Sequence, residues 1–138
     1  MIRAATRADL KRISEIRMAV RENRLSHPER IAADIAWLID NDGFLVFEAS
    51  GTIQGFASPD RRHGSIFALF VDPDFEGRGL GQALLAAACA KLAASGHAKA
   101  SLTTGHGTRA ERFYRRNGWT ATGLTDDGQI IFEKQIAA

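Results

Sequence analysis

The sequence contains little cysteine and no long hydrophobic run. Its single cysteine, Cys89, cannot form an internal disulfide, which excludes a disulfide-stabilised secreted fold and favours a reducing compartment. No apolar stretch approaches the roughly 20 residues that span a bilayer, and the first residues lack the apolar core of a signal peptide. We therefore expect a cytoplasmic protein without a membrane-spanning segment.

The chain also has little excess of one sign of charge over the other. The chain has 18 Lys and Arg residues against 16 Asp and Glu residues, for a formal net charge of +2. The basic residues are not clustered with aromatic residues that could stack on bases. This pattern argues against nucleic-acid binding and is compatible with a small anionic ligand.

The sequence does contain regularly alternating strand and helix patterns within 138 residues, the usual length of one domain. The segment "SIFALFV" (65–71) is nearly all apolar, which predicts a central strand. A strand, helix and strand over 65–104 predict one parallel strand pair, and the Asp-Gly turn in "TDDG" predicts a hairpin. The expected fold is a single α/β (α+β) domain over residues 1–138. It has a mixed, mostly antiparallel β-sheet flanked by helices, in the order β-α-α-β-β-β-α-β-α-β-β.

Three residue pairs have the spacing of a capping box, in which a Ser or Thr side chain and an acidic residue three positions later cap a helix start. They are Thr6 with Asp9, Ser26 with Glu29, and Thr108 with Glu111.

The segment "DFEGRGLGQALL" (74–85) places Gly77, Gly79 and Gly81 directly before an apolar helix pattern. Glycine weakens a helix by about 1 kcal/mol relative to alanine, so three of them need a reason. The first amides of a helix carry partial positive charge, and glycine lets them approach a phosphate. The segment predicts a phosphate-binding loop. It lacks the Lys-Ser/Thr of a P-loop and the glycine spacing of a dinucleotide fingerprint. A plain strand-to-helix turn is the alternative.

Two stretches together resemble the GNAT superfamily of acetyl-CoA-dependent N-acetyltransferases. The segment "LFVDPDFEGRGLGQALL" (69–85) is similar to the acetyl-CoA motif of that family, and "RAERFYRRNGW" (109–119) resembles its second motif. The expected element order also agrees with the family. The resemblance implies a GNAT-like fold and an acyltransferase. Such an enzyme moves an acetyl group from acetyl-CoA, as cosubstrate, to a primary amine by direct attack in a ternary complex.

The resemblance also implies roles for particular residues. Tyr114 would lie near the cofactor sulfur and act as general acid to the CoA thiolate, although its position beside Phe113 also fits a core aromatic residue. Arg115 or Arg116 would be candidates for contact with the 3′-phosphate. The implied cofactor-binding residues are Phe70, Val71, Gly77, Arg78, Gly79, Leu80, Gly81 and Gln82.

Two positions depart from the family pattern. Glu76 stands where the family usually has Gln or Arg, and a carboxylate there would repel a pyrophosphate unless it turned to solvent or capped the helix. Gly107 stands where many members have an Asn that contacts the pantetheine arm. We therefore expect backbone contacts from the loop and no side-chain contact from Glu76.

The general base is left open by the sequence, because Ser65 stands where some family members have a Glu. Glu48, Asp60 and His63 are candidates nearby, and a water chain is another. The four histidines are too scattered for a recognisable metal site, so no metal is expected. Cys89 falls in the middle of an apolar helix, where we expect it to be inert.

The acceptor is expected to be a small-molecule amine or the amine of a protein or peptide. The resemblance implies an acceptor cleft between the first helix pair and the final strands, and a homodimer is a further expectation that light scattering would test. The polar residues predicted to line the cleft are Arg21, Glu22, Asn23, His27, Asp126 and Asp127. A non-catalytic acyl-CoA-binding or sensing module is the alternative class, favoured by Ser65 at the base position.

Overall fold

The structure is a computed structural model that describes residues 1–20, 28–41 and 43–137, without the side chains of 28–32. The described residues form one sheet with the strand order β1-β2-β3-β4-β5-β7-β6. Its strands are β1 (Ile2–Ala4), β2 (Leu45–Ala49), β3 (Thr52–Asp60), β4 (Ser65–Val71), β5 (Lys99–Thr104), β6 (Thr120–Leu124) and β7 (Ile130–Gln135).

The helices connect these strands in the order that the sequence predicts. Two of them are short 3₁₀ turns. The helical elements are η1 (Arg7–Asp9), α1 (Leu10–Ala19), α2 (Pro28–Asp40), η2 (Pro73–Phe75), α3 (Leu80–Ala94) and α4 (Arg109–Arg116). The predicted fold class is confirmed: β4 and β5 pair in parallel, and the other strand pairs are antiparallel.

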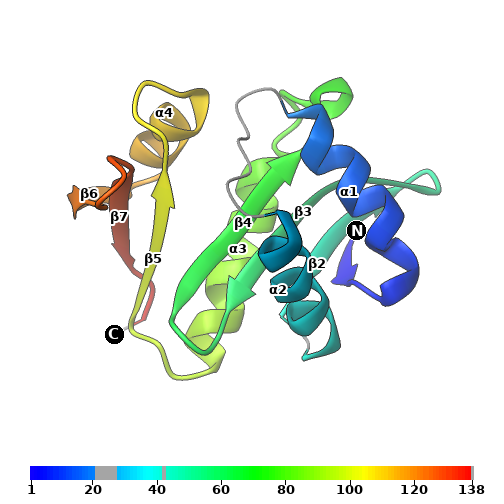
Figure 1. The fold of residues 1–138 in the computed structure, drawn as a ribbon, viewed down its shortest axis with the longest axis horizontal. Helices are drawn as coiled ribbons and strands as arrows, with labels where there is room; N and C mark the ends of the chain where they lie inside the picture. Colours follow the sequence, from blue (N-terminus) through cyan, green and yellow to red (C-terminus); the bar gives the residue numbers. More distant parts are fainter. Residues whose placement is uncertain (21–27, 42, 138) are drawn as a thin grey trace.

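Helices cover both faces of the sheet, as Figure 1 shows with α1 and α2 in front and α3 behind. The apolar stripe of α1, with Ile13 and Ile16, packs with Phe56 of β3 in one core cluster. The apolar stripe of α3, with Leu84 and Leu92, packs on the other face in a second cluster. Because apolar residues on each helix recur at helical spacing, each helix buries one side against the sheet. No helix among the described residues is long and apolar enough to cross a membrane.

The parallel pair β4–β5 holds together at one end only. Its register contains a single partner pair, Ser65 with Ser101, at the start of β4. On the other side of β4, Ser58 opposes Ala68 while the next residue, Pro59, opposes Ile66. One extra residue on β4 is therefore a β-bulge, which bends a strand and increases its twist. Beyond this point β4 and β5 diverge (Figure 1).

This divergence changes the burial expected for the apolar segment 65–71. The segment is the fourth of seven strands, as predicted for a central strand. However, Ile66 is its only buried residue, and the bulge residue Phe67 is 37% exposed. A nearly all-apolar central strand is normally buried on both faces and paired along both edges. Here β5 diverges after the Ser65–Ser101 pair, so the rest of β4 has no strand partner on that side among the described residues.

Two of the three predicted capping pairs lie in described residues. Asp9 accepts a hydrogen bond from the Thr6 N–H at 2.8 Å, at the start of η1. At α4 the Thr108 hydroxyl accepts from the Glu111 N–H at 3.1 Å. The Glu111 carboxylate accepts from the N–H of Gly107, at 2.7 Å, rather than from that of Thr108. The pair Ser26 and Glu29 lies outside the described side chains.

Candidate active site

The predicted glycine loop follows β4 and leads into α3. Gly77 has φ +77° and Gly79 has φ +80°, a left-handed conformation that glycine adopts without strain. A Cβ at either position would have no neighbouring atom within 4 Å. The loop surface is therefore open, and backbone conformation rather than crowding requires these two glycines. The first N–H groups of α3, which begins at Leu80, lack intrahelical partners there.

The third glycine has a different role. A Cβ on Gly81 would lie 3.4 Å from the ring of Phe113, on α4. This is an ordinary van der Waals distance, so an alanine would fit here and only a longer side chain would displace the ring. Gln82, one residue further, reaches the same helix end through a 3.4 Å contact from its Nε2 to the Asn117 Oδ1.

The start of the loop is fixed by Asp72, a buried residue directly after β4. Its carboxylate accepts from the Asp74 N–H at 2.9 Å and from the Arg12 guanidinium at 2.6 Å. Arg12 also donates to the carbonyl of Ile53 at 3.0 Å. These contacts tie α1, β3 and the loop together. The Asp74 and Arg12 hydrogen bonds outweigh burial and lower the pKa of Asp72, so its carboxylate stays charged at neutral pH.

Phe70 and Val71, the two residues expected to pair with the pantetheine arm, lie at the end of β4 opposite β3. They oppose Phe56 and Gly55 on that side. On the other side of β4, the register with β5 contains no pair beyond Ser65 and Ser101 over the described residues of both strands. A main-chain edge therefore faces the space left by β5, next to the glycine loop.

The carboxylate of Glu76 is neutralised by an arginine that the sequence analysis did not consider. Its Oε2 lies 3.0 Å from Nη1 of Arg109, the first residue of α4. The side chain is exposed to solvent, as one of the two expected arrangements requires, and it also pairs with Arg109. Arg78, inside the loop, lies over the ring of Phe75 with its Cζ 5.3 Å from the ring centre.

Tyr114 is both a core residue and a protonated phenol. It is 7% exposed and contacts the rings of Phe113, Trp119 and Phe132 at centroid distances of 5.3, 5.8 and 6.0 Å. Burial raises the pKa of its hydroxyl above the ordinary value. The phenol therefore keeps its proton throughout the physiological pH range, as a proton donor must.

Two of the three side chains considered as general base lie away from the glycine loop. Asp60 and His63 belong to the turn between β3 and β4, at the opposite end of β4 from the loop. The Asp60 carboxylate accepts from the Arg62 guanidinium at 2.9 and 2.8 Å and lies 3.1 Å from Nδ1 of His63. These bonds lower its pKa to about 2, which makes it a poor proton acceptor. Glu48 is on β2, where it accepts from Arg3 at 3.0 Å.

The loop between β5 and α4 carries the second departure from the family pattern. Gly107 has φ +77°, and asparagine is among the residues that adopt this region most readily after glycine. Gly107 therefore has a backbone conformation that Asn can also adopt, but it lacks the Asn side chain of the family pattern. His106, beside it, is 81% exposed and lies 3.4 Å from the carboxylate of Glu111.

The acceptor-cleft residues and Cys89 remain to be placed. The residues Arg21, Glu22, Asn23 and His27 lie outside the described part of the chain. Asp127 bonds the hydroxyl of Thr125 within the β6–β7 turn, which is a turn-forming contact. Burial raises the pKa of the Cys89 thiol, so it is a weak nucleophile. Across residues 1–20, 28–41 and 43–137, no three potential ligand side chains gather as a metal site.

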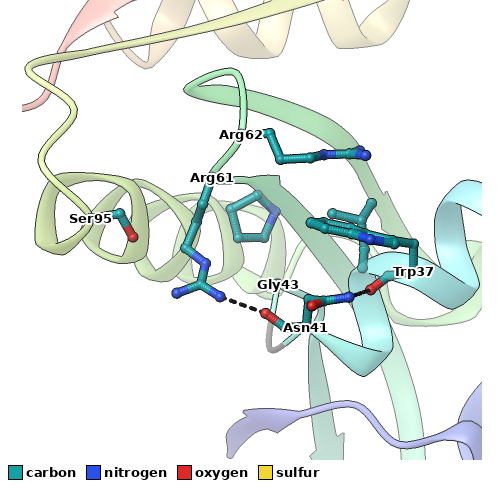
Figure 2. A pocket seen from close by; sticks show the side chains of 8 residues that line it. Trp37, Asn41, Gly43, Arg61, Arg62 and Ser95 are labelled. Atoms are coloured by element: carbon teal, nitrogen blue, oxygen red, sulfur yellow. Dashed lines mark hydrogen bonds between the residues drawn. The ribbon is translucent and has the colours of Figure 1, made fainter.

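A shallow pocket of about 320 Å³ lies at the other end of the sheet (Figure 2). Its cations already have partners. Arg61 donates to the carbonyl of Asn41 at 2.5 Å, and Arg62, bound to Asp60, lies 4.0 Å above the ring of Trp37. These contacts attach α2 to the β3–β4 turn, so the pocket is part of the scaffold. The sequence does not predict it, because its lining comes from α2, β3, a turn and the end of α3.

The mixed sheet thus opens beside a glycine-rich helix N-terminus, and the two features together suit an extended, phosphate-bearing ligand. The family comparison agrees and is more specific. The profile described as the Acetyltransferase (GNAT) family matches residues 10–119. The chain therefore belongs to the GNAT acetyltransferase family, a family of acyltransferases.

Curated relatives carry related names. An uncharacterised N-acetyltransferase of Methanocaldococcus jannaschii is 37% identical over 95 residues, which cover 60% of this chain and 42% of that protein. A mycothiol acetyltransferase of Beutenbergia cavernae is 37% identical over 91 residues, covering 65% of this chain and 30% of that protein. The chain thus spans less than half the length of these relatives.

Solved structures share the fold over nearly the whole chain. The ribosomal-protein-S18-alanine N-acetyltransferase of Escherichia coli has a TM-score of 0.78 at 23% identity, covering 100% of this chain and 94% of that one. The PaiA N-acetyltransferase of Thermoplasma acidophilum, solved with coenzyme A, has a TM-score of 0.77 at 19% identity and covers 98% of both chains.

Proposed function

We propose that this protein, as a single domain over residues 1–138, is an N-acetyltransferase that moves the acetyl group of acetyl-CoA to a primary amine. The observation that carries the proposal is the open edge of β4 directly beside the glycine loop. One ligand that is both amide-rich and phosphate-bearing would use both features at once. A cytoplasmic location is part of the proposal, supported by the lone cysteine.

The cofactor would be held mainly by backbone groups. An extended pantetheine arm has amides that can pair with an exposed strand edge, as in other cases of strand addition. We assign this pairing to Phe70 and Val71. We assign the pyrophosphate to the amides of residues 77–82, where the helix N-terminus favours negative charge. The open surface at Gly77 and Gly79 supports this assignment.

The chemistry would be a direct transfer. The neutral amine attacks the thioester carbonyl, the carbon–sulfur bond breaks, and the departing thiolate takes a proton. We assign this proton to the Tyr114 hydroxyl, whose raised pKa keeps it loaded. The proton lost by the amine would pass to solvent through water, because Asp60 is held as a carboxylate of low basicity. A proton from solvent would then return to the Tyr114 phenolate and restore the phenol.

The acceptor would be a small-molecule amine or the amine of a protein or peptide. The names of the relatives support this breadth, because one structural relative is named for a ribosomal protein and curated relatives for mycothiol. An α-amine, with an ordinary pKa near 8, needs less help from a base than a lysine amine near 10.4. An acceptor with an α-amine therefore fits a site without a dedicated base best.

The test is release of free thiol from acetyl-CoA in the presence of amine panels. The panels contain amino acids, polyamines and short peptides with free N-termini, and mass spectrometry identifies the product. We expect thiol release that depends on an added amine and a product heavier by one acetyl group. Binding of acetyl-CoA without transfer to any amine would instead favour an acyl-CoA-binding or sensing module. The absence of binding would remove both proposals.

A further inference from the structure

An ion pair joins the glycine loop to α4. Glu76 directly precedes Gly77, and its carboxylate lies 3.0 Å from the guanidinium of Arg109. Glu76 belongs to the segment after β4, whereas Arg109 belongs to the segment after β5, the strand that has diverged from β4. The ion pair therefore crosses the opening of the sheet at the edge of the proposed phosphate site.

This ion pair is weak enough to be exchanged. The two side chains are 67% and 38% exposed, for Arg109 and Glu76 respectively. Exposed pairs of this kind contribute little free energy, because solvent screens both charges. Arg109 is also the first residue of α4, where the helix dipole disfavours a cation unless an anion lies beside it. A phosphate group carries at least the charge of a carboxylate and can accept two parallel bonds from a guanidinium.

The surrounding charge favours an incoming anion. Besides Arg109, α4 carries three exposed arginines, and Arg78 lies in the loop itself. The acidic Glu111 of α4 already accepts from Arg115 at 3.0 Å and from the N–H of Gly107. Glu76 thus occupies the guanidinium of Arg109 that a ligand on the loop could otherwise bind. The exposed arginines of α4 are Arg109, Arg112, Arg115 and Arg116.

We propose that a phosphate group of the bound cofactor displaces Glu76 from Arg109. In this exchange Glu76 is an internal competitor, and the Glu76–Arg109 pair sets cofactor affinity as a pair of positioning residues. The inference rests on the proposed function and goes further, because it assigns a role to a side chain where the family pattern has Gln or Arg. It also explains how a carboxylate is tolerated here: Arg109 holds it until the phosphate arrives.

The test measures the dissociation constant of acetyl-CoA by calorimetry for the wild type, Glu76→Gln, Arg109→Gln and the double variant. Removing the competitor should tighten binding about threefold to tenfold, and removing the arginine should weaken it by a similar factor. On the Arg109→Gln background, Glu76→Gln should lose most of its effect, because there is no arginine left to compete for. The kcat of Glu76→Gln should stay near the wild-type value while its KM for acetyl-CoA falls.

A second ligand and a second arginine variant extend the test. Dephospho-CoA distinguishes the two phosphate sources: the gain from Glu76→Gln disappears with it if the 3′-phosphate meets Arg109, and persists if the pyrophosphate does. Arg109→Lys keeps the positive charge but lacks the paired N–H donors of a guanidinium. We expect its affinity for acetyl-CoA to lie between that of the wild type and that of Arg109→Gln. It also provides a conservative variant if Arg109→Gln folds poorly, which thermal melting would report.

The matched control is Asp40→Asn, which breaks the similarly exposed pair of Arg7 and Asp40, with side chains 65% and 44% exposed. It should leave the affinity for acetyl-CoA unchanged. Wild-type binding with unchanged or weakened binding by Glu76→Gln would overturn the exchange and leave the proposed function standing. Absence of binding by the wild type would remove the proposed function, and the exchange with it.

Discussion

At the scale of single residues, Tyr114 has both the burial of a core residue and the protonated hydroxyl that the proposed proton donor needs. Its position on α4 predicted either a core aromatic residue or a proton donor. The structure gives a buried ring in an aromatic cluster, and the same burial holds its hydroxyl in the protonated form. A buried phenol can therefore stabilise the fold and still carry the proton that the proposed transfer requires.

The prediction is that Tyr114→Phe separates these roles. The ring contacts remain, so stability and acetyl-CoA affinity should change little. Loss of the proton donor should lower kcat by about 100-fold, within the usual range for a general acid. Steady-state kinetics and calorimetry on the same preparation measure both quantities. Undiminished turnover would show that solvent protonates the thiolate and that Tyr114 acts only in packing.

Asp60 provides a second residue-scale prediction, on stability against pH. Its folded-state pKa of about 2 lies below the ordinary value of 3.8. A depressed pKa gives stability that is present above the unfolded-state pKa and is lost as pH falls through the folded-state pKa. The contribution is on the order of 2 kcal/mol for this shift. It should be complete at pH 5 and disappear between about pH 4 and pH 2.

The comparison of wild type with Asp60→Asn tests this. The variant should be less stable by about 2 kcal/mol at neutral pH, because Arg62 and His63 no longer have a charged carboxylate to bind. The difference should shrink as the pH falls below 4. Denaturant unfolding at a series of pH values measures it. A difference that stays constant from pH 7 to pH 2.5 would mean that the ionised carboxylate is not what stabilises the turn.

At the scale of elements, the three glycines of the loop differ in their structural surroundings. Gly77 and Gly79 are required by their left-handed backbone, while Gly81 has no positive φ and lies beside the ring of Phe113. The sequence alone predicted a loop of unusual backbone freedom before a helix. It could not separate conformation from packing, because Phe113 is 32 positions away along the chain.

Gly79→Ala should be destabilising through its backbone alone. A Cβ there meets no atom within 4 Å, so the cost is that of a left-handed alanine, about 1–2 kcal/mol. Gly51→Ala is the matched control: it has φ +74° and an equally open surrounding in the β2–β3 turn. The two variants should lose similar free energy of unfolding in denaturant titrations. A much larger loss for Gly79→Ala would indicate a packing role for this glycine.

The strands and helices follow closely from the sequence, for identifiable reasons. Apolar residues at helical spacing predicted α1 and α3, and the capping pair Thr108 and Glu111 predicted the start of α4. The bulge in β4 was not predictable, because its residues are all apolar and no residue in it marks a kink. The partner of Glu76 was missed for a similar reason: Arg109 is distant in sequence and its pairing depends on the approach of two halves of the sheet.

At the scale of the whole molecule, the fold consists of two parts of a sheet that meet along a short contact. One part holds β1 to β4 with α1, α2 and α3, and the other holds β5, β7 and β6 with α4 (Figure 1). The parts are joined by the Ser65–Ser101 pair, by the ion pair of Glu76 and Arg109, and by one apolar core cluster. In this cluster Leu84 and Leu92 of α3 pack with residues of β5 and β7. A ligand between β4 and β5 would add a further connection between them.

The measurement that tests the central claim most directly is a calorimetric titration of acetyl-CoA into the wild type, Gly79→Glu and Gly51→Glu. The account predicts one binding site per chain in the wild type, loss of binding in Gly79→Glu, and wild-type affinity in Gly51→Glu. The added carboxylate repels the pyrophosphate only where it lies on the loop. If the wild type does not bind acetyl-CoA, or if Gly79→Glu binds it as tightly as Gly51→Glu does, the glycine loop is not the cofactor site and the account is wrong.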